Sequence, residues 1–432
     1  MTAVLSTTLA VLCATAATPG RGASATEPPD GYAFAADARR AEGADSAADA
    51  VRLAPGETYR SSLPGNGAVH YRLSLDGTSN VYVAVTAVPR PGTAVFAADG
   101  IRVSVRDGDG GSCSFDSASV GAARSPRPVT AWGLREISPG KTRCRDAGTY
   151  HVTVERTGSH RSAPGAWDLE LAVFSEPGLE RPGATRAPGT WDSASPAPPA
   201  GEPGRRRGGA GFAGAAPLGQ GVWRDGIRPG QTLFYAVPVD WGQQLYATAE
   251  LDGSGGGRGY VPGAVRLTLH NPARGQVEDA GSGYDGGRAT AALAPVPPVA
   301  YANRHAAAEK VRGMRFAGTY YLVVHLAAGV AGDFGEGPFG LTLRVRVGGS
   351  AQPGPGYAGE SVPRGAFEVA EGDRVAAPEG RGGGGGPVMT AVAVGGIGAG
   401  SLLLAGLGVW TVAARRRAAA GRFRGPADTG PP

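Results

Sequence analysis

The sequence predicts an all-β protein with two tandem β-sandwich domains of a jelly-roll-like kind and one C-terminal transmembrane helix. Three observations predict this class. Short runs of residues alternate apolar and polar side chains, Gly, Pro and Asp break every run, and an ordered set of short motifs occurs twice. No convincing amphipathic helix interrupts these runs, so both copies of the motif set are expected to fold into sheets alone.

The repeated motifs keep their order along the chain. Ala147-Gly-Thr-Tyr150 returns as Ala317-Gly-Thr-Tyr320, and each opens a strand-like run. The other pairs are Pro55-Gly-Glu-Thr58 with Pro229-Gly-Gln-Thr232, Ile101–Val105 with Val265–Leu269, and Trp167–Leu171 with Phe339–Leu343. All offsets fall between about 164 and 174 residues, which chance similarity would not keep in order. The two halves are therefore predicted to be copies of one domain.

The first domain is predicted over residues 41–177 and the second over residues 212–347. Period-2 alternation predicts strands in the first copy at Tyr71–Leu75, Val81–Val85, Ile101–Val105, Tyr150–Val154 and Trp167–Val173. The second copy has them at Thr232–Val239, Gln244–Leu251, Val265–Leu269, Thr319–Leu326 and Leu341–Val347. Residues 280–308 are rich in Gly, Pro and Ala, so a long loop is expected there.

Composition predicts three connecting segments around these domains. Residues 26–40 are polar and read as a flexible leader, and residues 178–211 are rich in Pro, Gly, Ala and Arg and read as a linker. Residues 348–387 are rich in Gly and Pro and are expected to form a stalk that leaves the domain orientation free.

The N-terminal residues 1–25 resemble a secretory signal peptide. Leu9–Leu12 leads through small residues to Ala23-Ser-Ala25, an A-x-A cleavage pattern. Cys13 lies in this segment after Leu12, which is a poor lipoprotein site. The mature chain is expected to begin near Thr26 without Cys13.

Residues 388–414 carry no charged side chain, and at about 1.5 Å per residue they are long enough to cross a bilayer. Arg415-Arg-Arg417 opens a basic tail over residues 415–432, and the positive-inside rule places that tail in the cytoplasm. The chain is thus predicted to cross the plasma membrane once, with its domains outside. Gly396 and Gly400 form a G-x-x-x-G that suits helix–helix contact, although a Gly-rich composition alone produces such spacing.

The positive net charge does not predict a nucleic-acid partner. The tail holds five Arg and one Asp, and Arg21 belongs to the signal segment. Removing these six basic residues from 42 leaves 36, and removing one acidic residue from 37 also leaves 36. The exported part is formally neutral, so its charge gives no warrant for binding nucleic acid, and the tail is expected to lie near anionic lipid headgroups.

Cys113 and Cys144 are the cysteines of the predicted exported part, and both lie in the first copy. Disulfides persist outside the cytoplasm, so these two are predicted to pair. The second copy has neither cysteine, and the bond is therefore expected to be a local staple of the first domain.

No sequence motif predicts catalysis. The chain has no G-x-S-x-G, H-E-x-x-H or P-loop, and its six histidines are scattered, so no cofactor is predicted. Asp107 and Asp109 offer carboxylates on one tight turn, which suits Ca²⁺ but equally suits a hairpin turn. Trp132, Trp223 and Trp241 are candidates for stacking on a glycan, with the domain core as the alternative.

The repeated unit resembles the bacterial pre-peptidase C-terminal domain. The resemblance rests on the Pro-Gly turns at Pro55 and Pro229, the aromatic-centred strands Val69–Leu73 and Leu233–Val237, and the two Ala-Gly-Thr-Tyr motifs. It covers most of residues 53–173 and 227–347, and its motifs are short. It implies a small β-sandwich that serves as a non-catalytic accessory or binding module, and it implies no catalytic residue.

These observations together predict a non-catalytic, membrane-anchored binding or structural protein of a bacterial envelope, with composition favouring a Gram-positive source. Its expected partners are an envelope protein or a cell-wall glycan. Two alternatives stay open: a cell-surface hydrolase with an unrecognised site, and an accessory subunit or sensor of a membrane complex. The sequence does not predict an oligomeric state.

Overall fold

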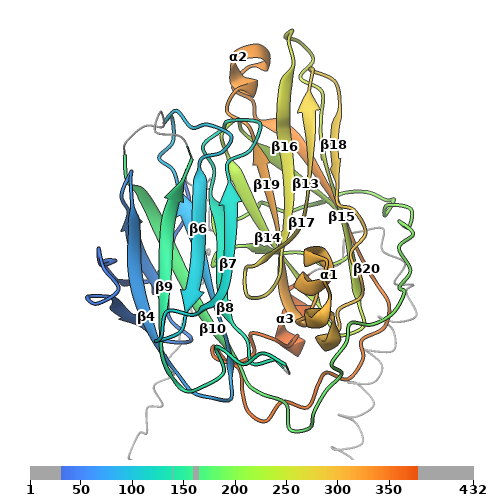
Figure 1. Ribbon diagram of the computed structural model, residues 1–432. Coiled ribbons are helices and arrows are strands. Elements are labelled where there is room, and N and C mark those ends of the chain that lie inside the picture. Colours follow the sequence, from blue (N-terminus) through green and yellow to red (C-terminus); the bar gives the residue numbers. More distant parts are fainter. Residues whose placement is uncertain (1–30, 139, 159–164, 378–432) are drawn as a thin grey trace, which may run out of the picture.

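The computed structural model describes residues 31–138, 140–158 and 165–377. These residues form two β-sandwiches that lie side by side, each built from two five-stranded sheets (Figure 1). Strand is the prevailing regular structure of the described part, and its helices are short. The predicted all-β class with two sandwiches is therefore confirmed for this part of the chain.

The first sandwich holds strands β1 to β10. One sheet has the order β1 (Arg39–Arg40), β3 (Thr58–Leu63), β10 (Trp167–Glu176), β5 (Asn80–Val88) and β8 (Val129–Arg135). The other has the order β2 (Val51–Leu53), β4 (Ala68–Leu75), β9 (Gly148–Thr157), β6 (Gly100–Arg106) and β7 (Ser112–Ser119). The short first strand of each sheet pairs in parallel, and every other pairing is antiparallel.

The second sandwich repeats this arrangement. One sheet has the order β11 (Gly204–Arg205), β13 (Gly221–Ile227), β20 (Phe339–Gly348), β15 (Gln244–Leu251) and β18 (Ala289–Ala292). The other has β12 (Ala216–Pro217), β14 (Thr232–Val239), β19 (Gly318–Leu326), β16 (Val261–His270) and β17 (Gln276–Tyr284). Short helices join some strands: η1 (Tyr301–His305), α1 (Glu309–Gly313) and α2 (Val330–Phe334), with α3 (Glu371–Ala376) after the last strand. Strand by strand, the order in the two sandwiches is identical, as expected of two copies of one domain.

The repeated motifs form equivalent hydrogen bonds and turns in the two copies. The hydroxyl of Tyr150 donates to the carbonyl of Asp146 at 2.7 Å, and that of Tyr320 donates to the carbonyl of Phe316 at 2.8 Å. Each tyrosine thus ties the start of a long strand to the loop that precedes it, as in the tyrosine corner of other sandwiches. In the Pro-Gly turns, Gly56 and Gly230 have φ of 85° and 83°, a conformation that favours glycine.

Alternation of side chains builds each core. In β3 and β4, every second residue points inward and is buried while its neighbours are exposed or half-buried. All ten predicted strands lie within observed ones. Ten strands of the described part were not predicted. Four of them have only two or three residues, too few to show an alternation: β1, β2, β11 and β12. The other six are β3, β7, β8, β13, β17 and β18, and Ser, Gly and Ala weaken the alternation in β7, β8, β17 and β18. The expectation of a long loop over residues 280–308 is therefore wrong: the end of β17, all of β18 and η1 fall there.

The two sandwiches meet at a buried seam that two ion pairs cross. Glu170 and Glu176 project from β10 of the first sandwich and are almost completely buried. Arg274 of the second sandwich donates to Glu170 with an N–O distance of 2.6 Å, and Arg304 donates to Glu176, also at 2.6 Å. A buried carboxylate is stable only with such partners, so these pairs fix how the sandwiches face each other.

An aromatic cluster fills the seam between the ion pairs. It contains Tyr82 and Phe174 of the first sandwich, Phe316 of the second, and Phe367 from beyond the last strand. The rings of Phe316 and Phe367 stack with centroids 4.5 Å apart, and Tyr82 meets Phe316 edge-on at 5.1 Å. Burial of these rings adds hydrophobic stabilisation to the polar contacts.

The segments at both ends of the described part also pack on the seam. Tyr32 donates to Glu170 at 2.8 Å, and Tyr357 donates to Glu176 at 2.8 Å. Val362 pairs with Ser175 through two backbone hydrogen bonds. The expectations of a flexible leader and of an unattached stalk are thus wrong for residues 31–40 and 348–377. Likewise, the last part of the predicted linker already belongs to the second sandwich, since β11 pairs with β13.

The predicted signal peptide (residues 1–25), transmembrane helix (388–414) and cytoplasmic tail (415–432) lie outside the described residues, as do Gly396 and Gly400. In the part of the chain that the structure describes, no helix has the length and apolar character needed to cross a membrane.

We predict that Glu176→Gln destabilises the folded chain by about 3 to 5 kcal/mol, because Arg304 would keep a buried charge without its counter-charge. Urea unfolding measures this loss. Glu360→Gln is the matched control, since Glu360 pairs with Arg364 at an exposed site and its loss should change little. Equal effects of the two substitutions would contradict the assigned role of the seam pair.

Acid should also destabilise the protein, through two buried histidines near the seam. Burial lowers the pKa of His325 to about 3 and that of His270 to about 4, from 6.5. Both are therefore neutral when folded and bind protons on unfolding. Their contribution is complete above the unfolded pKa and is lost as pH falls from 6.5 toward the folded values.

Between about pH 7 and pH 5, each histidine should thus remove about 2 kcal/mol from the free energy of unfolding. Urea titrations at the two pH values measure the change. The double variant His270→Gln/His325→Gln should lose less stability over this range. A wild-type protein that is equally stable at both pH values would refute the prediction.

Candidate functional site

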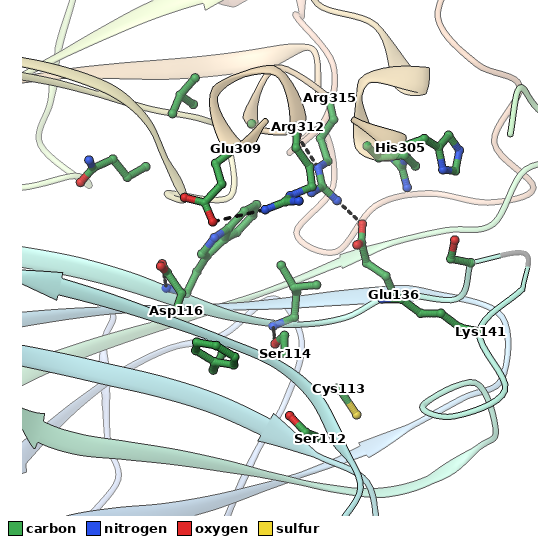
Figure 2. Close-up of a pocket in the computed structure, with 18 of the residues that line it drawn as sticks. Ser112, Cys113, Ser114, Asp116, Glu136, Lys141, His305, Glu309, Arg312 and Arg315 are labelled. Carbon is green, nitrogen blue, oxygen red and sulfur yellow. Dashed lines mark hydrogen bonds and ion pairs between the residues drawn. The ribbon is translucent and has the colours of Figure 1, made fainter. Parts of the chain in front are cut away.

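A cleft of about 730 Å³ lies between the two sandwiches. Strand β7 and the residues that follow β8 form one wall, and α1 with the adjoining loop of the second sandwich forms the other (Figure 2). Thr185, from the segment that joins the copies, closes part of the rim. The cleft therefore exists only because the seam holds the two domains together.

The β7 wall is polar because its side chains replace a missing neighbouring strand. The Ser114 hydroxyl accepts a hydrogen bond from the Leu134 amide at 2.7 Å, and the Asp116 carboxylate accepts one from the Trp132 amide at 3.1 Å. Both amides belong to β8, the edge strand of the opposite sheet. These contacts join the two sheet edges and line the cleft with hydroxyl and carboxylate groups.

The opposite wall places guanidinium groups over β7. Arg312 on α1 forms an ion pair with Glu309 at 3.3 Å, and Arg315 pairs with Glu136 across the cleft (Figure 2). Arg315 is completely buried and also lies near the Trp132 ring, with its guanidinium carbon 5.7 Å from the ring centre. The side of the cleft near Glu136 is thus bridged by a contact between the two domains.

The carboxyl group of Asp116 on the β7 wall is a weaker acid than an ordinary aspartic acid. Burial raises the pKa of Asp116, and two backbone N–H groups that donate to it offset this only in part. For Glu176, burial also acts to raise the pKa, but Arg304 and hydrogen bonds from Asn80 and Tyr82 outweigh it and lower the pKa. Arg304 lines the cleft, so the seam pair and the cleft share one residue.

The structure brings one serine and one histidine together, but away from the cleft. Ser125 of the first sandwich lies 2.9 Å from Nε2 of His325, whose Nδ1 lies 2.9 Å from the Thr232 hydroxyl. Ser125 and His325 are both buried, and the Ser125 hydroxyl also accepts a hydrogen bond from the Ala328 amide. Since His325 has its pKa lowered to about 3, it is a weak base. The trio therefore serves as a seam contact and does not present a nucleophile to solvent.

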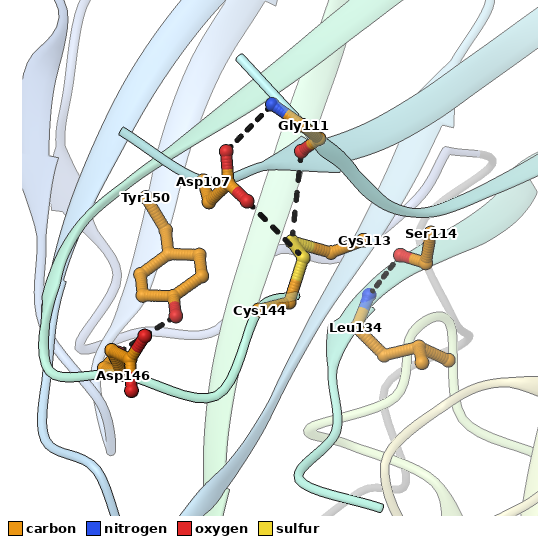
Figure 3. Close-up of a disulfide and its surroundings, with 8 residues drawn as sticks. All are labelled: Asp107, Gly111, Cys113, Ser114, Leu134, Cys144, Asp146 and Tyr150. Carbon is orange, nitrogen blue, oxygen red and sulfur yellow. Dashed lines mark hydrogen bonds between the residues drawn. A yellow bond between two sulfur atoms is a disulfide. The ribbon is translucent and has the colours of Figure 1, made fainter. Parts of the chain in front are cut away.

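The predicted disulfide between Cys113 and Cys144 is confirmed (Figure 3). It ties β7, the cleft wall, to the loop before β9, and the Cα atoms lie 5.7 Å apart. Asp107 lies close to both sulfurs, but bonded sulfurs are not thiolates and these three residues are poorly suited to a metal.

Asp107, the candidate calcium ligand, accepts a hydrogen bond within its own turn. Its carboxylate accepts a hydrogen bond from the Gly111 amide at 2.6 Å, and Asp109 is exposed on the same turn. The second copy has Asn271 at the equivalent position, where the Asn271 side-chain oxygen accepts from the Gly275 amide at 2.9 Å. The uncharged Asn271 side chain accepts the equivalent hydrogen bond, so this turn conformation does not require a bound cation.

The three predicted stacking tryptophans are not brought together. Trp223 and Trp241 are buried in the core of the second sandwich. Trp132 lies half-buried on the cleft wall, with its ring stacked on Tyr82 at 5.7 Å. Of the three, Trp132 alone lies beside the cleft, and no shared stacking surface forms. Sequence reasoning missed the rest of the cleft, because its residues come from three distant segments.

Comparisons with known proteins identify no family. No protein-family model matches the chain, and no curated protein matches it. Among solved structures, the chain is similar to the CUB1-EGF-CUB2 domain of human MASP-1/3, with 9% identity over 67% of this chain and 99% of that chain and a TM-score of 0.16.

Two further solved structures show a comparable degree of likeness. The tandem CBM22 domains of Paenibacillus barcinonensis Xyn10C share 12% identity over 69% of this chain and 93% of that chain, with a TM-score of 0.17. Tripeptidyl peptidase 2 shares 9% over 66% of this chain and 22% of that chain, with a TM-score of 0.20. At these scores the likenesses carry no conclusion about function, and the β-sandwich description rests on the strand pairing itself.

Removal of the disulfide should loosen the cleft wall. Cys113→Ser/Cys144→Ser opens a loop with a sequence separation of 31 residues. The entropy of that loop predicts a loss of about 3 to 4 kcal/mol in the free energy of unfolding. Urea unfolding measures the loss, and amide hydrogen exchange should rise in β7 before it rises in β14 or β19. The stability of the double variant should not change when a reductant is added. If reduction of the wild-type protein changes neither its stability nor the hydrogen exchange of β7, the disulfide does not stabilise the cleft wall.

Proposed function

We propose that this chain is a non-catalytic, membrane-anchored protein of a bacterial cell envelope that uses its paired sandwiches to bind a protein or glycan partner outside the cytoplasm. The observation that carries the proposal is the polar cleft of about 730 Å³ at the seam. Its walls come from different domains, as ligand sites in multidomain proteins often do.

The rigidity of the cleft supports a binding role. The ion pairs of Glu170 and Glu176 and the aromatic cluster hold the two walls at a fixed spacing. Binding to a preformed cleft does not include the free-energy cost of ordering the cleft walls. The resemblance of each copy to pre-peptidase C-terminal domains stays a prediction, and it favours the same non-catalytic role.

The sequences of the two ends of the chain and the disulfide support the proposed compartment. A bond between Cys113 and Cys144 is expected to persist in an oxidising compartment. The predicted signal peptide and membrane helix would place the sandwiches there. These features support an extracytoplasmic location with the C-terminal tail in the cytoplasm.

A second candidate function is that of an accessory subunit or sensor in a membrane complex. One contact favours it: Tyr357, which precedes the predicted membrane helix, donates to Glu176, and Glu176 also pairs with Arg304 of the cleft. The segment that leads toward the membrane is thus attached at the ligand cleft. A hydrolase gains no comparable support, since the Ser125–His325 pair is buried.

The direct test is site-specific photocrosslinking of the full chain on its native cells. A benzophenone amino acid replaces Phe115, which lies on the cleft wall and is 71% exposed, or replaces Tyr260, which is 65% exposed and lies outside the cleft. We expect a specific crosslinked protein or glycan from position 115 that is absent from position 260, identified by mass spectrometry. The same products at both positions, or none at position 115, would refute a partner in the cleft.

A further inference from the structure

The cleft continues into a second cavity along the seam. This second cavity has a volume of about 460 Å³, and the two share Glu136, Ser138, Thr185, Arg304 and His305 in their walls. The combined space, here called the seam groove, runs from β7 past η1 to residues 178–184 of the segment that joins the copies. A groove of this kind suits an extended ligand better than a compact one.

Charge in the seam groove is unbalanced once internal pairs are taken into account. The acidic side chains Glu136 and Glu309 already form ion pairs with Arg315 and Arg312, and Asp116 accepts two backbone hydrogen bonds. Lys141, Arg145, Arg181 and His305 also line the groove, and among the described residues none of them forms an ion pair. The hydrogen bonds to Asp116 do not cancel its charge, but Lys141, Arg145 and Arg181 outnumber this one carboxylate. The net charge of the groove is therefore positive, which complements an anionic ligand.

The remaining wall groups suit a sugar. Ser112, Ser138 and Thr185 place hydroxyl groups around the groove, and Phe115 on β7 has an aromatic ring open to solvent. Hydroxyl groups both donate to and accept from sugar hydroxyls, and an exposed ring offers a flat apolar face. Tyr301, in the second cavity, is less available because the Arg304 guanidinium lies 3.5 Å from its ring centre.

An extended peptide fits the groove less well. A peptide that adds to a sheet needs unpaired backbone groups at a strand edge. The amides of Trp132 and Leu134 on β8 are already bonded to Asp116 and Ser114. The β8 edge of the groove is thus closed to strand addition at these positions, whereas a sugar needs no strand edge.

We infer that the seam groove binds an anionic oligosaccharide, with Phe115 stacking on a sugar ring and Lys141, Arg145, Arg181 and His305 contacting its negative groups. This inference rests on the proposed function and names the ligand class for the same site. The carboxylate or phosphate of the ligand would meet the cationic end of the groove, and its neutral rings would lie toward β7.

The test is isothermal titration calorimetry of the full chain in detergent micelles. The probes are an oligogalacturonide, a neutral malto-oligosaccharide of the same length and an oligoglutamate peptide of equal charge. We expect the oligogalacturonide to bind most tightly, and its affinity to fall as salt concentration rises.

Two variants locate the binding. Lys141→Ala/Arg145→Ala/Arg181→Ala should weaken oligogalacturonide binding by about tenfold or more at low salt, because three attractive charges are lost. Phe115→Ala should weaken it by about fivefold. The matched controls are Arg52→Ala/Arg72→Ala/Arg90→Ala, which removes three exposed charges outside the groove, and Tyr260→Ala. Both controls should bind as the wild type does.

The outcomes separate this inference from the proposed function. No binding of the oligogalacturonide, equal effects of the two triple variants, or tighter binding of oligoglutamate would each overturn the anionic-sugar assignment. If photocrosslinking at position 115 still captures a partner in those cases, the binding role stands and only the ligand class is wrong. If it captures none, both proposals fall.

Discussion

The buried carboxylates of Glu170 and Glu176 are the constraint on which the arrangement of this molecule depends. Both lie on β10, the central strand of a sheet, and neither has access to water. Each gathers its partners from separate parts of the chain. Glu170 contacts Tyr32, the Ala35 amide and Arg274, and Glu176 contacts Asn80, Tyr82, Arg304 and Tyr357. The need to compensate two buried charges thus determines the position of the second sandwich and of both terminal segments.

The two copies share a framework and differ where they meet. By the spacing of the repeated motifs, the positions of Glu170 and Glu176 correspond to Thr342 and Gly348 in the second copy. The hairpin turns at Asp107 and Asn271 keep the same backbone hydrogen bonds, but Arg274 stands where the first copy has Gly110. Arg274 has a positive φ of 62°, which disfavours most side chains, and from there it reaches Glu170. One copy supplies the acids of the seam and the other supplies the bases, so the duplicated domains no longer perform the same task.

Sequence reasoning succeeded where a local pattern determines structure. Ten of the strands follow from alternation, and the disulfide follows from two cysteines in a segment that is predicted to be exported. The seam does not follow, because Glu170 and Glu176 resemble the solvent-facing charges of an ordinary strand until the second sandwich is placed against them. Single aromatic residues in Gly- and Pro-rich segments, such as Tyr32 and Phe367, carry no periodic signal, so their packing was missed. The cleft was missed for the same reason: β7 is rich in Ser, and its partners lie on the other domain.

The contacts of Glu176 connect three features that otherwise look independent. Arg304 lies in the wall of the groove, Tyr82 belongs to the aromatic cluster, and Tyr357 belongs to the segment that leads to the predicted membrane helix. All three donate to this one carboxylate, whose pKa is held low by Arg304 against the effect of burial. A ligand that draws Arg304 toward the groove would weaken its bond to Glu176 and would leave Tyr82 and Tyr357 to compensate the charge. The groove and the segment of Tyr357 are therefore joined by a single shared acceptor, Glu176, which holds the cleft in a fixed relation to that segment within the described part of the chain.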